Sequence, residues 1–77
     1  MDYMDKLIQL RKEAKMSQKD IGEYLGTLQQ QVAKYEKKTQ ELPIRRLIQL
    51  AKLYNVSVDW LLGLSNTRDI QNPVVSD

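Results

Sequence analysis

The sequence predicts an all-α domain built from five short helices. Apolar side chains recur at helical spacing in several windows, as at Leu47 and Leu50. These windows are separated by start and stop signals such as Ser17 and Gly26. A chain of 77 residues with 42% hydrophobic residues makes one small domain and is not typical of disorder.

The first two helices are predicted over residues 3–15 and 18–25. The first carries an apolar stripe at Leu7, Leu10 and Ala14, and Met16 after it is expected to be buried. Ser17 is a good N-cap for the second helix, and Asp20 completes part of a capping box. Ile21, Tyr24 and Leu25 form its apolar face. Gly22 costs roughly 1 kcal/mol against alanine in mid-helix, so another helix is expected to pass very close to it. Gly26 ends the helix because glycine takes a positive φ without strain.

The third helix is predicted over residues 28–37 and has two faces at 100° per residue. Leu28, Val32 and Tyr35 form the face that we expect to be buried. The opposite side carries Gln30, Ala33, Lys34 and Lys37, and Gln29 and Gln31 flank its two edges. Three consecutive glutamines therefore lie at the start of the helix. Such a short helix would not be stable alone, so it must dock on the others.

Residues 38–42 form a loop, and Pro43 begins a fourth helix that runs to about Tyr54. Ile44 and Ile48 widen its apolar stripe, which predicts a helix at the centre of the core, and Asn55 ends it. A short fifth helix ends at Gly63. It holds more apolar residues than one buried face needs, which suggests a second subunit. Tyr24, Tyr35 and Tyr54 are interpreted as core residues. The domain is expected to span residues 1–64, followed by a mobile polar tail over 65–77.

Composition excludes several classes of function. The chain has no cysteine and no histidine, which removes thiol chemistry and the commonest metal ligand and general base. We therefore expect no enzyme, no cofactor and no metal. No apolar run is long enough for a signal peptide or a membrane span, so a cytoplasmic protein is expected. Residues 1–52 hold eleven of the twelve basic side chains against seven of the ten acidic ones, so a polyanion would meet that part.

A short helix, a glycine turn and a second short helix form a unit in which the second helix can enter the DNA major groove. The chain resembles the Cro/repressor-like (XRE) helix-turn-helix family over about residues 4–64. The matching pieces are LIQLRKEAKMSQKDIGEYLG, VAKYEKKTQELP and LIQLAKLYNVSVDWLLG. The resemblance implies a compact lambda-repressor-like fold of five helices, with a DNA-reading third helix and usually dimeric binding to double-stranded DNA.

The resemblance also implies roles for particular residues. The base-reading residues would be Gln29 and Gln30, followed by Gln31 and Ala33. Phosphate contacts would come from Gln18, Lys34, Lys37, Lys38 and Thr39. Arg11 and Glu36 would form a structural pair. Glutamine chemistry supports the base-reading role independently, because its amide can pair bidentately with adenine. Contacts between subunits are suggested for Trp60, Leu61 and Leu64. The family usually has glycine where Lys38 stands, so either Lys38 is left-handed or the loop differs. It usually has alanine where Gly22 stands.

The leading hypothesis is a sequence-specific DNA-binding regulator, interpreted as a repressor, that binds a two-fold symmetric operator as a homodimer. The alternative is an antitoxin-type interaction module. In that case the tail over residues 65–77 would hold a protein partner and DNA binding would be secondary.

Overall fold

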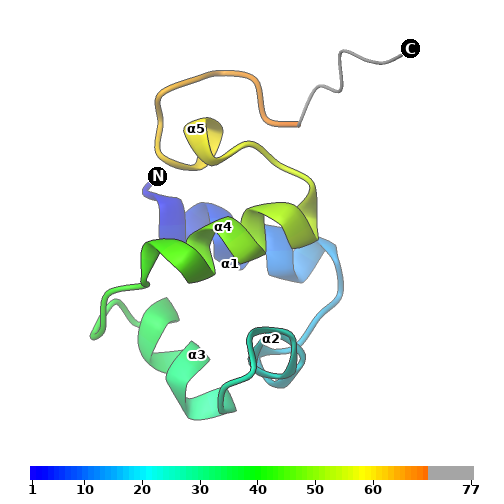
Figure 1. Ribbon diagram of the computed structural model, residues 1–77, viewed down its shortest axis with the longest axis vertical. Coiled ribbons are helices and arrows are strands. Elements are labelled where there is room, and N and C mark those ends of the chain that lie inside the picture. The colour runs from blue at the N-terminus through cyan, green and yellow to red at the C-terminus, as the bar shows by residue number, and fades with distance from the viewer. Residues whose placement is uncertain (70–77) are drawn as a thin grey trace.

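The computed structural model describes residues 1–69, which contain five helices and one isolated β-bridge. The helices are α1 (Tyr3–Glu13), α2 (Gln18–Leu25), α3 (Gln29–Glu36), α4 (Ile44–Tyr54) and α5 (Val58–Leu61). In Figure 1, α4 crosses in front of α1 in the middle of the molecule, α2 and α3 lie below them, and α5 lies above. The predicted all-α fold of five helices is therefore confirmed for the described part of the chain.

All five helices end in the same way. The residue after each helix, or one residue further, is left-handed: Lys15, Gly26, Lys38, Asn55 and Gly63 have φ between 57° and 80°. In each case its amide and the next amide donate back into the last helical turn. This is the pattern of the Schellman motif, which satisfies carbonyl groups that the helix end would leave free.

These endings correct the predicted helix bounds. The helix expected over residues 3–15 stops at Glu13, because Lys15 is left-handed with φ 57° and Met16 N donates to the Arg11 carbonyl. The short fifth helix stops at Leu61, before the expected Gly63. Of the two alternatives for Lys38, the structure takes the left-handed one, with φ 63°.

The core gathers thirteen buried apolar side chains from all five helices and two connections: Met4, Leu7, Leu10, Ile21, Leu25, Val32, Tyr35, Leu42, Leu47, Leu50, Ala51, Val56 and Leu61. Val32 and Tyr35 confirm two of the three residues expected on the buried face of α3. The prediction was wrong for Leu28, which is 70% exposed. Leu28 is the N-cap of α3 with an extended backbone, so helical spacing does not govern its direction.

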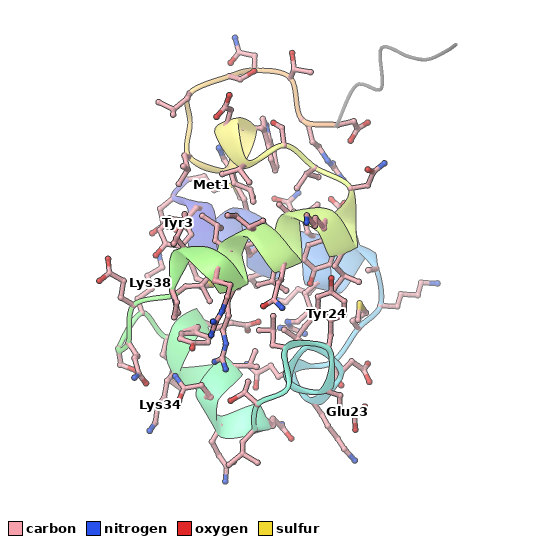
Figure 2. The ribbon with its side chains drawn as sticks, viewed as in Figure 1. Met1, Tyr3, Glu23, Tyr24, Lys34 and Lys38 are labelled. Carbon is pink, nitrogen blue, oxygen red and sulfur yellow. The ribbon has the colours of Figure 1, made fainter. Side chains whose placement is uncertain are left out.

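Several other residues expected in the core lie at its edge or outside it. Ile44 and Ile48 are exposed on the outer edge of α4, so its buried stripe is narrower than predicted. Ala14 is exposed because α1 has already ended there. Tyr24 is 44% exposed, and its hydroxyl donates to the Gln49 carbonyl at 3.1 Å, which ties α2 to α4 (Figure 2). Tyr54 and Met16 are only partly buried.

Residues 65–69, assigned from sequence to the polar tail, fold back onto the domain. Ser57 N donates to the Arg68 carbonyl at 2.8 Å, and Ser57 Oγ donates to the Thr67 carbonyl at 2.9 Å. Val56 and Asp69 form the β-bridge. The expectations for residues 70–77, including a mobile tail, lie outside the described residues. None of the helices over residues 1–69 combines the length and the hydrophobicity that a membrane span requires.

Candidate DNA-binding surface

Three local features define the shape of the α2–turn–α3 unit. Ser17 Oγ accepts from the Asp20 amide and the Asp20 carboxylate accepts from the Ser17 amide, so the capping box is complete. Gly26 makes the turn at φ 76°. A Cβ on Gly22 would lie 3.0 Å from the Thr27 carbonyl oxygen and 3.2 Å from the Leu28 carbonyl carbon. The close approach expected at Gly22 is therefore present, and it comes from the backbone that enters α3.

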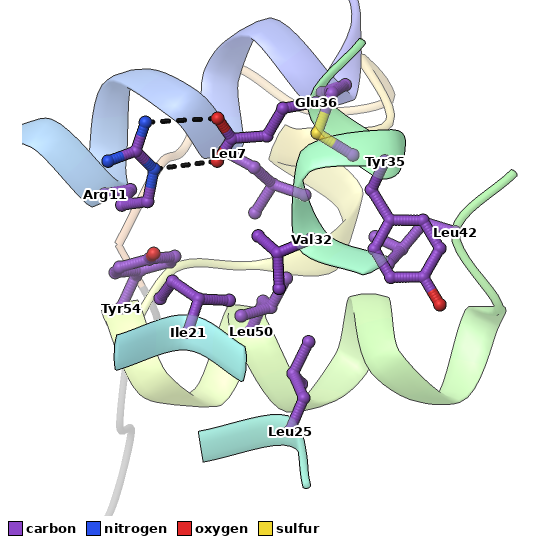
Figure 3. Close-up of a pocket in the computed structure, with 11 residues that line it drawn as sticks. Leu7, Arg11, Ile21, Leu25, Val32, Tyr35, Glu36, Leu42, Leu50 and Tyr54 are labelled. Carbon is purple, nitrogen blue, oxygen red and sulfur yellow. Dashed lines mark hydrogen bonds and ion pairs between the residues drawn. The ribbon is translucent and has the colours of Figure 1, made fainter. Parts of the chain in front are cut away.

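A network of hydrogen bonds fixes the far end of α3 to α1. Arg11 Nε donates to Glu36 Oε2 at 2.7 Å and Arg11 Nη2 donates to Glu36 Oε1 at 3.1 Å, the fork geometry of a bidentate pair (Figure 3). Arg11 Nη1 also donates to the Met16 carbonyl at 3.0 Å. Both charged side chains are about one-seventh exposed. The predicted structural pair is therefore formed, and it holds α3 in position.

Below this pair lies a small cavity of about 20 Å³, enough for one water molecule by volume. Its wall is almost entirely apolar and includes Leu7, Val32 and Leu50 (Figure 3). Such a wall offers a water few polar partners, and no cofactor would fit in that volume. Among residues 1–69 no group of three acidic side chains is placed to hold a metal ion.

The four base-reading candidates share the outer side of α3 but differ in exposure and in side-chain hydrogen bonding. Gln29 and Gln30 lie in the first turn and are exposed, with no hydrogen bond from either side chain within residues 1–69. Gln31 is half-buried, and its Nε2 donates to Gln40 Oε1 at 2.8 Å. Ala33 is partly exposed one turn further. Two glutamine amides are thus free to pair with a ligand at the start of the helix.

The phosphate-binding candidates divide into free and engaged groups. Lys34 and Lys37 are exposed and form no ion pair within the described residues. Gln18, at the start of α2, donates through Nε2 to Glu36 Oε1 at 2.9 Å, so its amide is oriented by the structural pair. Thr39 Oγ1 donates to the Lys34 carbonyl at 3.2 Å, which stabilises the end of α3.

Lys38 has a different environment from its neighbours. Its Nζ lies 2.9 Å from Asp2 Oδ2 and 3.1 Å from Asp5 Oδ1, the N-cap and a first-turn residue of α1. The hydrogen bond from Lys38 lowers the pKa of Asp2, and the two carboxylates raise the pKa of Lys38. Lys34 lies at the α3 end of the molecule, whereas Lys38 lies higher, beside the start of α4 (Figure 2). A phosphate would have to compete with Asp2 and Asp5 for Lys38, whereas Lys34 needs no such exchange.

Two supporting residues were missed from the sequence. Arg46 Nη1 donates to the Tyr35 hydroxyl at 2.7 Å, so α4 orients the buried tyrosine of α3. Gln40 holds the Gln31 amide from the loop after α3. The two consecutive arginines at the start of α4 indicated such a contact in the sequence, because cations are disfavoured at a helix N-terminus unless they have another partner. Nothing in the sequence indicated the Gln31–Gln40 contact.

The three residues suggested for subunit contacts do not lie in equivalent environments. Leu61 is 1% exposed and belongs to the core, so it cannot contact a partner. The Trp60 ring has Lys6 Nζ 4.7 Å and the Arg68 guanidinium carbon 5.7 Å from its centroid, so cations of its own chain cover it. Leu64 is 74% exposed and available. Part of the apolar surplus expected after residue 58 is therefore present, because Leu62 and Leu64 are exposed while Trp60 is covered by Lys6 and Arg68.

Comparison with known proteins places this architecture in a family. A family model described as Helix-turn-helix matches residues 7–61, which include the α2–turn–α3 unit. The chain is 37% identical over 67 residues to the uncharacterised HTH-type transcriptional regulator YobD of Bacillus subtilis, covering 87% of this chain and 60% of that protein.

The chain is also 30% identical over 82 aligned residues to the HTH-type transcriptional regulator ImmR of Bacillus subtilis. This match covers 100% of this chain and 65% of the relative, so the chain spans slightly less than two thirds of both regulators. No solved structure matches the chain significantly. The matched residues and the helical arrangement agree: the chain belongs to the XRE-type helix-turn-helix family, a family of regulators and not of enzymes.

Proposed function

We propose that the chain is a sequence-specific DNA-binding transcription regulator that acts as a repressor. In this proposal α3 enters the major groove, and two copies bind a two-fold symmetric operator whose half-sites lie ~34–36 Å apart. The observation that carries the proposal is that Gln29 and Gln30, which form no side-chain hydrogen bond within residues 1–69, are exposed at the start of a helix whose far end is fixed by the Arg11–Glu36 pair. A glutamine amide pairs bidentately with adenine N6 and N7, which suits it to direct readout.

The charges around these glutamines support the same orientation on DNA. Lys34 and Lys37 follow on the exposed side of α3 and would meet the phosphates that flank the groove. Gln18 lies at the start of α2, where a backbone phosphate would accept from its second amide hydrogen while Glu36 retains the first. Ala33 is small enough to let α3 approach the bases closely and could touch a thymine methyl group.

Selection of bound DNA from a random pool tests this function directly. The expected result is an enriched sequence with a two-fold repeat, with centres about one helical turn apart. Binding to the selected site should weaken steeply with added salt, because each neutralised phosphate releases counterions. A Gln9→Ala variant is the matched control for changes to Gln29 and Gln30, since Gln9 is an exposed glutamine on α1. Failure to enrich any sequence over the starting pool would refute the proposal.

A further inference from the structure

A cation at the end of α3 is bound by two acids at the start of α1. Lys38 comes two residues after α3 ends, and its Nζ lies within 3.1 Å of carboxylate oxygens of both Asp2 and Asp5. We name these three residues the Lys38 cluster. Their side chains are 41–49% exposed, so a phosphate could reach them. The cluster holds two negative charges and one positive charge, so its net charge is opposite in sign to that of the neighbouring Lys37.

The start of α1 fixes the two acids in this position. Asp2 is the N-cap of α1, and its Oδ1 accepts from the Asp5 amide at 2.8 Å while its Oδ2 faces Lys38. Asp5 lies in the first turn, so one helical turn presents both carboxylates together. The backbone around Lys38 is fixed as well, since the Thr39 amide donates to the Lys34 carbonyl. The contact therefore joins two ordered helix ends.

The main effect of this contact is on Lys38 and not on folding. Ion pairs this exposed add little to folding stability, and dissolved salt screens them. The hydrogen bonds from Asp2 and Asp5 raise the pKa of Lys38, and the same contact lowers the pKa of Asp2, so these groups are charged at neutral pH. A phosphate that approached Lys38 would also meet both carboxylates, and like charges repel.

We propose that Asp2 and Asp5 hold Lys38 away from the DNA backbone and thereby lower the affinity of the chain for DNA of any sequence. The inference rests on the proposed DNA-binding function and removes Lys38 from the residues that would contact phosphate. The contact is autoinhibitory, because it withdraws a cation from a surface whose binding to DNA depends on cations. Phosphate contacts carry no sequence information, so operator and unrelated DNA should be affected equally.

Salt-dependent titrations of Lys34→Met and Lys38→Met test whether Lys38 contacts phosphate. The probes are a duplex carrying the selected operator and a duplex of unrelated sequence. Lys34→Met should weaken binding to both and make the slope of log K against log salt shallower by about 0.9, because one phosphate contact is lost. Lys38→Met should leave the slope close to that of wild type. If Lys38→Met lowers the slope as much as Lys34→Met does, Lys38 contacts phosphate and the inference is overturned.

Neutralising the two acids should release Lys38. Asp2→Asn combined with Asp5→Asn keeps the start of α1, because asparagine caps a helix as well as aspartate does. The double variant should bind both duplexes more tightly than wild type, with a slope steeper by about 0.9. Its affinity should therefore fall about 3.5-fold further than that of wild type between about 50 and 200 mM salt.

Glu41→Gln is the matched control for the loss of one acid. Glu41 is exposed, lines the same open groove as Lys38, and forms no ion pair within residues 1–69, so its removal should leave the slope unchanged. Circular dichroism checks the folding of every variant. Asp5→Asn alone leaves the N-cap intact and should show part of the gain, which keeps the test decisive if the double variant does not fold.

The same substitutions in a Lys38→Met background separate the release of Lys38 from a general loss of negative charge. The gain in affinity and the steeper slope should both disappear there, because no lysine is left to release. A gain of equal size without Lys38, or no gain in a folded Asp2→Asn, Asp5→Asn variant, would overturn the inference. A wild type that binds unrelated DNA but selects no sequence would refute the proposed function alone.

Discussion

Removal of the Glu36 carboxylate should destabilise the whole domain, because three hydrogen bonds end on it. Two come from Arg11 and one from Gln18. In the Glu36→Leu variant Arg11 keeps only the Met16 carbonyl as a partner, while its charge stays about six-sevenths buried. Breaking a buried pair from one side costs roughly 3–5 kcal/mol. Because both side chains are partly exposed, we expect the Glu36→Leu variant to lose about 3 kcal/mol of unfolding free energy, the lower end of this range.

That loss is large for a domain of this size. At 0.05–0.15 kcal/mol per residue, 77 residues provide about 4–12 kcal/mol in total. A loss of about 3 kcal/mol corresponds to a fall in Tm of about 12–24 °C for a domain of 60–100 residues. Thermal and urea unfolding followed by circular dichroism would measure it. Glu23→Leu is the control, because Glu23 is an exposed acid on α2, and should change stability by less than about 0.5 kcal/mol.

A double-mutant cycle then separates the interaction free energy of the Arg11–Glu36 pair from the cost of leaving one charge buried without its partner. Arg11→Met combined with Glu36→Leu removes both charges, and an apolar replacement of a buried ion pair is often neutral or stabilising. The double variant should therefore be more stable than either single variant, with a coupling of about 2 kcal/mol or more. Additive effects of the two substitutions, or a Glu36→Leu loss below about 1 kcal/mol, would refute the role of this pair in fixing α3.

Three further predictions concern the helix ends and the titrating groups. Lys15→Gly should stabilise the domain by about 0.5–1 kcal/mol in urea unfolding, since it relieves a left-handed non-glycine residue; Lys38→Gly should give a smaller gain, because it also loses Asp2 and Asp5. NMR titration should find the pKa values of Asp2 and Asp20 below 3.8, and Lys38→Met should raise the pKa of Asp2 but not that of Asp20. The stability that ionised Asp2 contributes is present above pH 3.8 and is lost as the pH falls through the lowered pKa of Asp2. Burial raises the pKa of Tyr54 to about 12, so a tyrosinate absorbance step near pH 12 should vanish in Tyr54→Phe. The stability that neutral Tyr54 contributes is present below pH 10 and should be lost as the pH rises through 12.

Where interactions between neighbouring residues decide the structure, the sequence alone was sufficient to predict it. Ser17 and Asp20 form a capping box from residues three apart, and Gly26 makes the turn that follows, so the start and end of α2 could be read directly. Gly22 was informative because glycine in mid-helix needs a reason, and the reason is the backbone that enters α3. Helical periodicity also identified Val32 and Tyr35 as the buried side of α3.

Periodicity failed at the ends of helices, where its geometry no longer holds. Leu28 fits the apolar stripe of α3 by spacing, but as an N-cap it has an extended backbone and its side chain is exposed. Lys15 ends α1 early in a conformation that lysine side chains disfavour, so its type carried no stop signal. The first turn of α3 fixes Leu28 by hydrogen bonds to its carbonyl, whereas Lys15 is fixed by hydrogen bonds that it and Met16 donate back into the last turn of α1.

The exposure of the main candidate residues was predictable, but their interactions were not. The positions of Gln29, Gln30 and Lys34 follow from the helix alone, and all three are exposed as expected. The engagement of Lys38 by Asp2 joins residues 36 positions apart in the chain, and Gln31 meets Gln40 across a loop. Spacing within one helix cannot show such contacts. They reduce the number of side chains that are free to bind DNA.

Operator titration with glutamine variants tests the central claim most directly. Gln29→Ala and Gln30→Ala should each weaken binding to the selected operator by about 1–3 kcal/mol, which is the discrimination of a bidentate base contact. Binding to unrelated DNA should change little, because phosphate contacts dominate there. Gln9→Ala should leave both affinities unchanged. If Gln29→Ala and Gln30→Ala keep the wild-type affinity and specificity for the operator, α3 does not read its bases through these side chains.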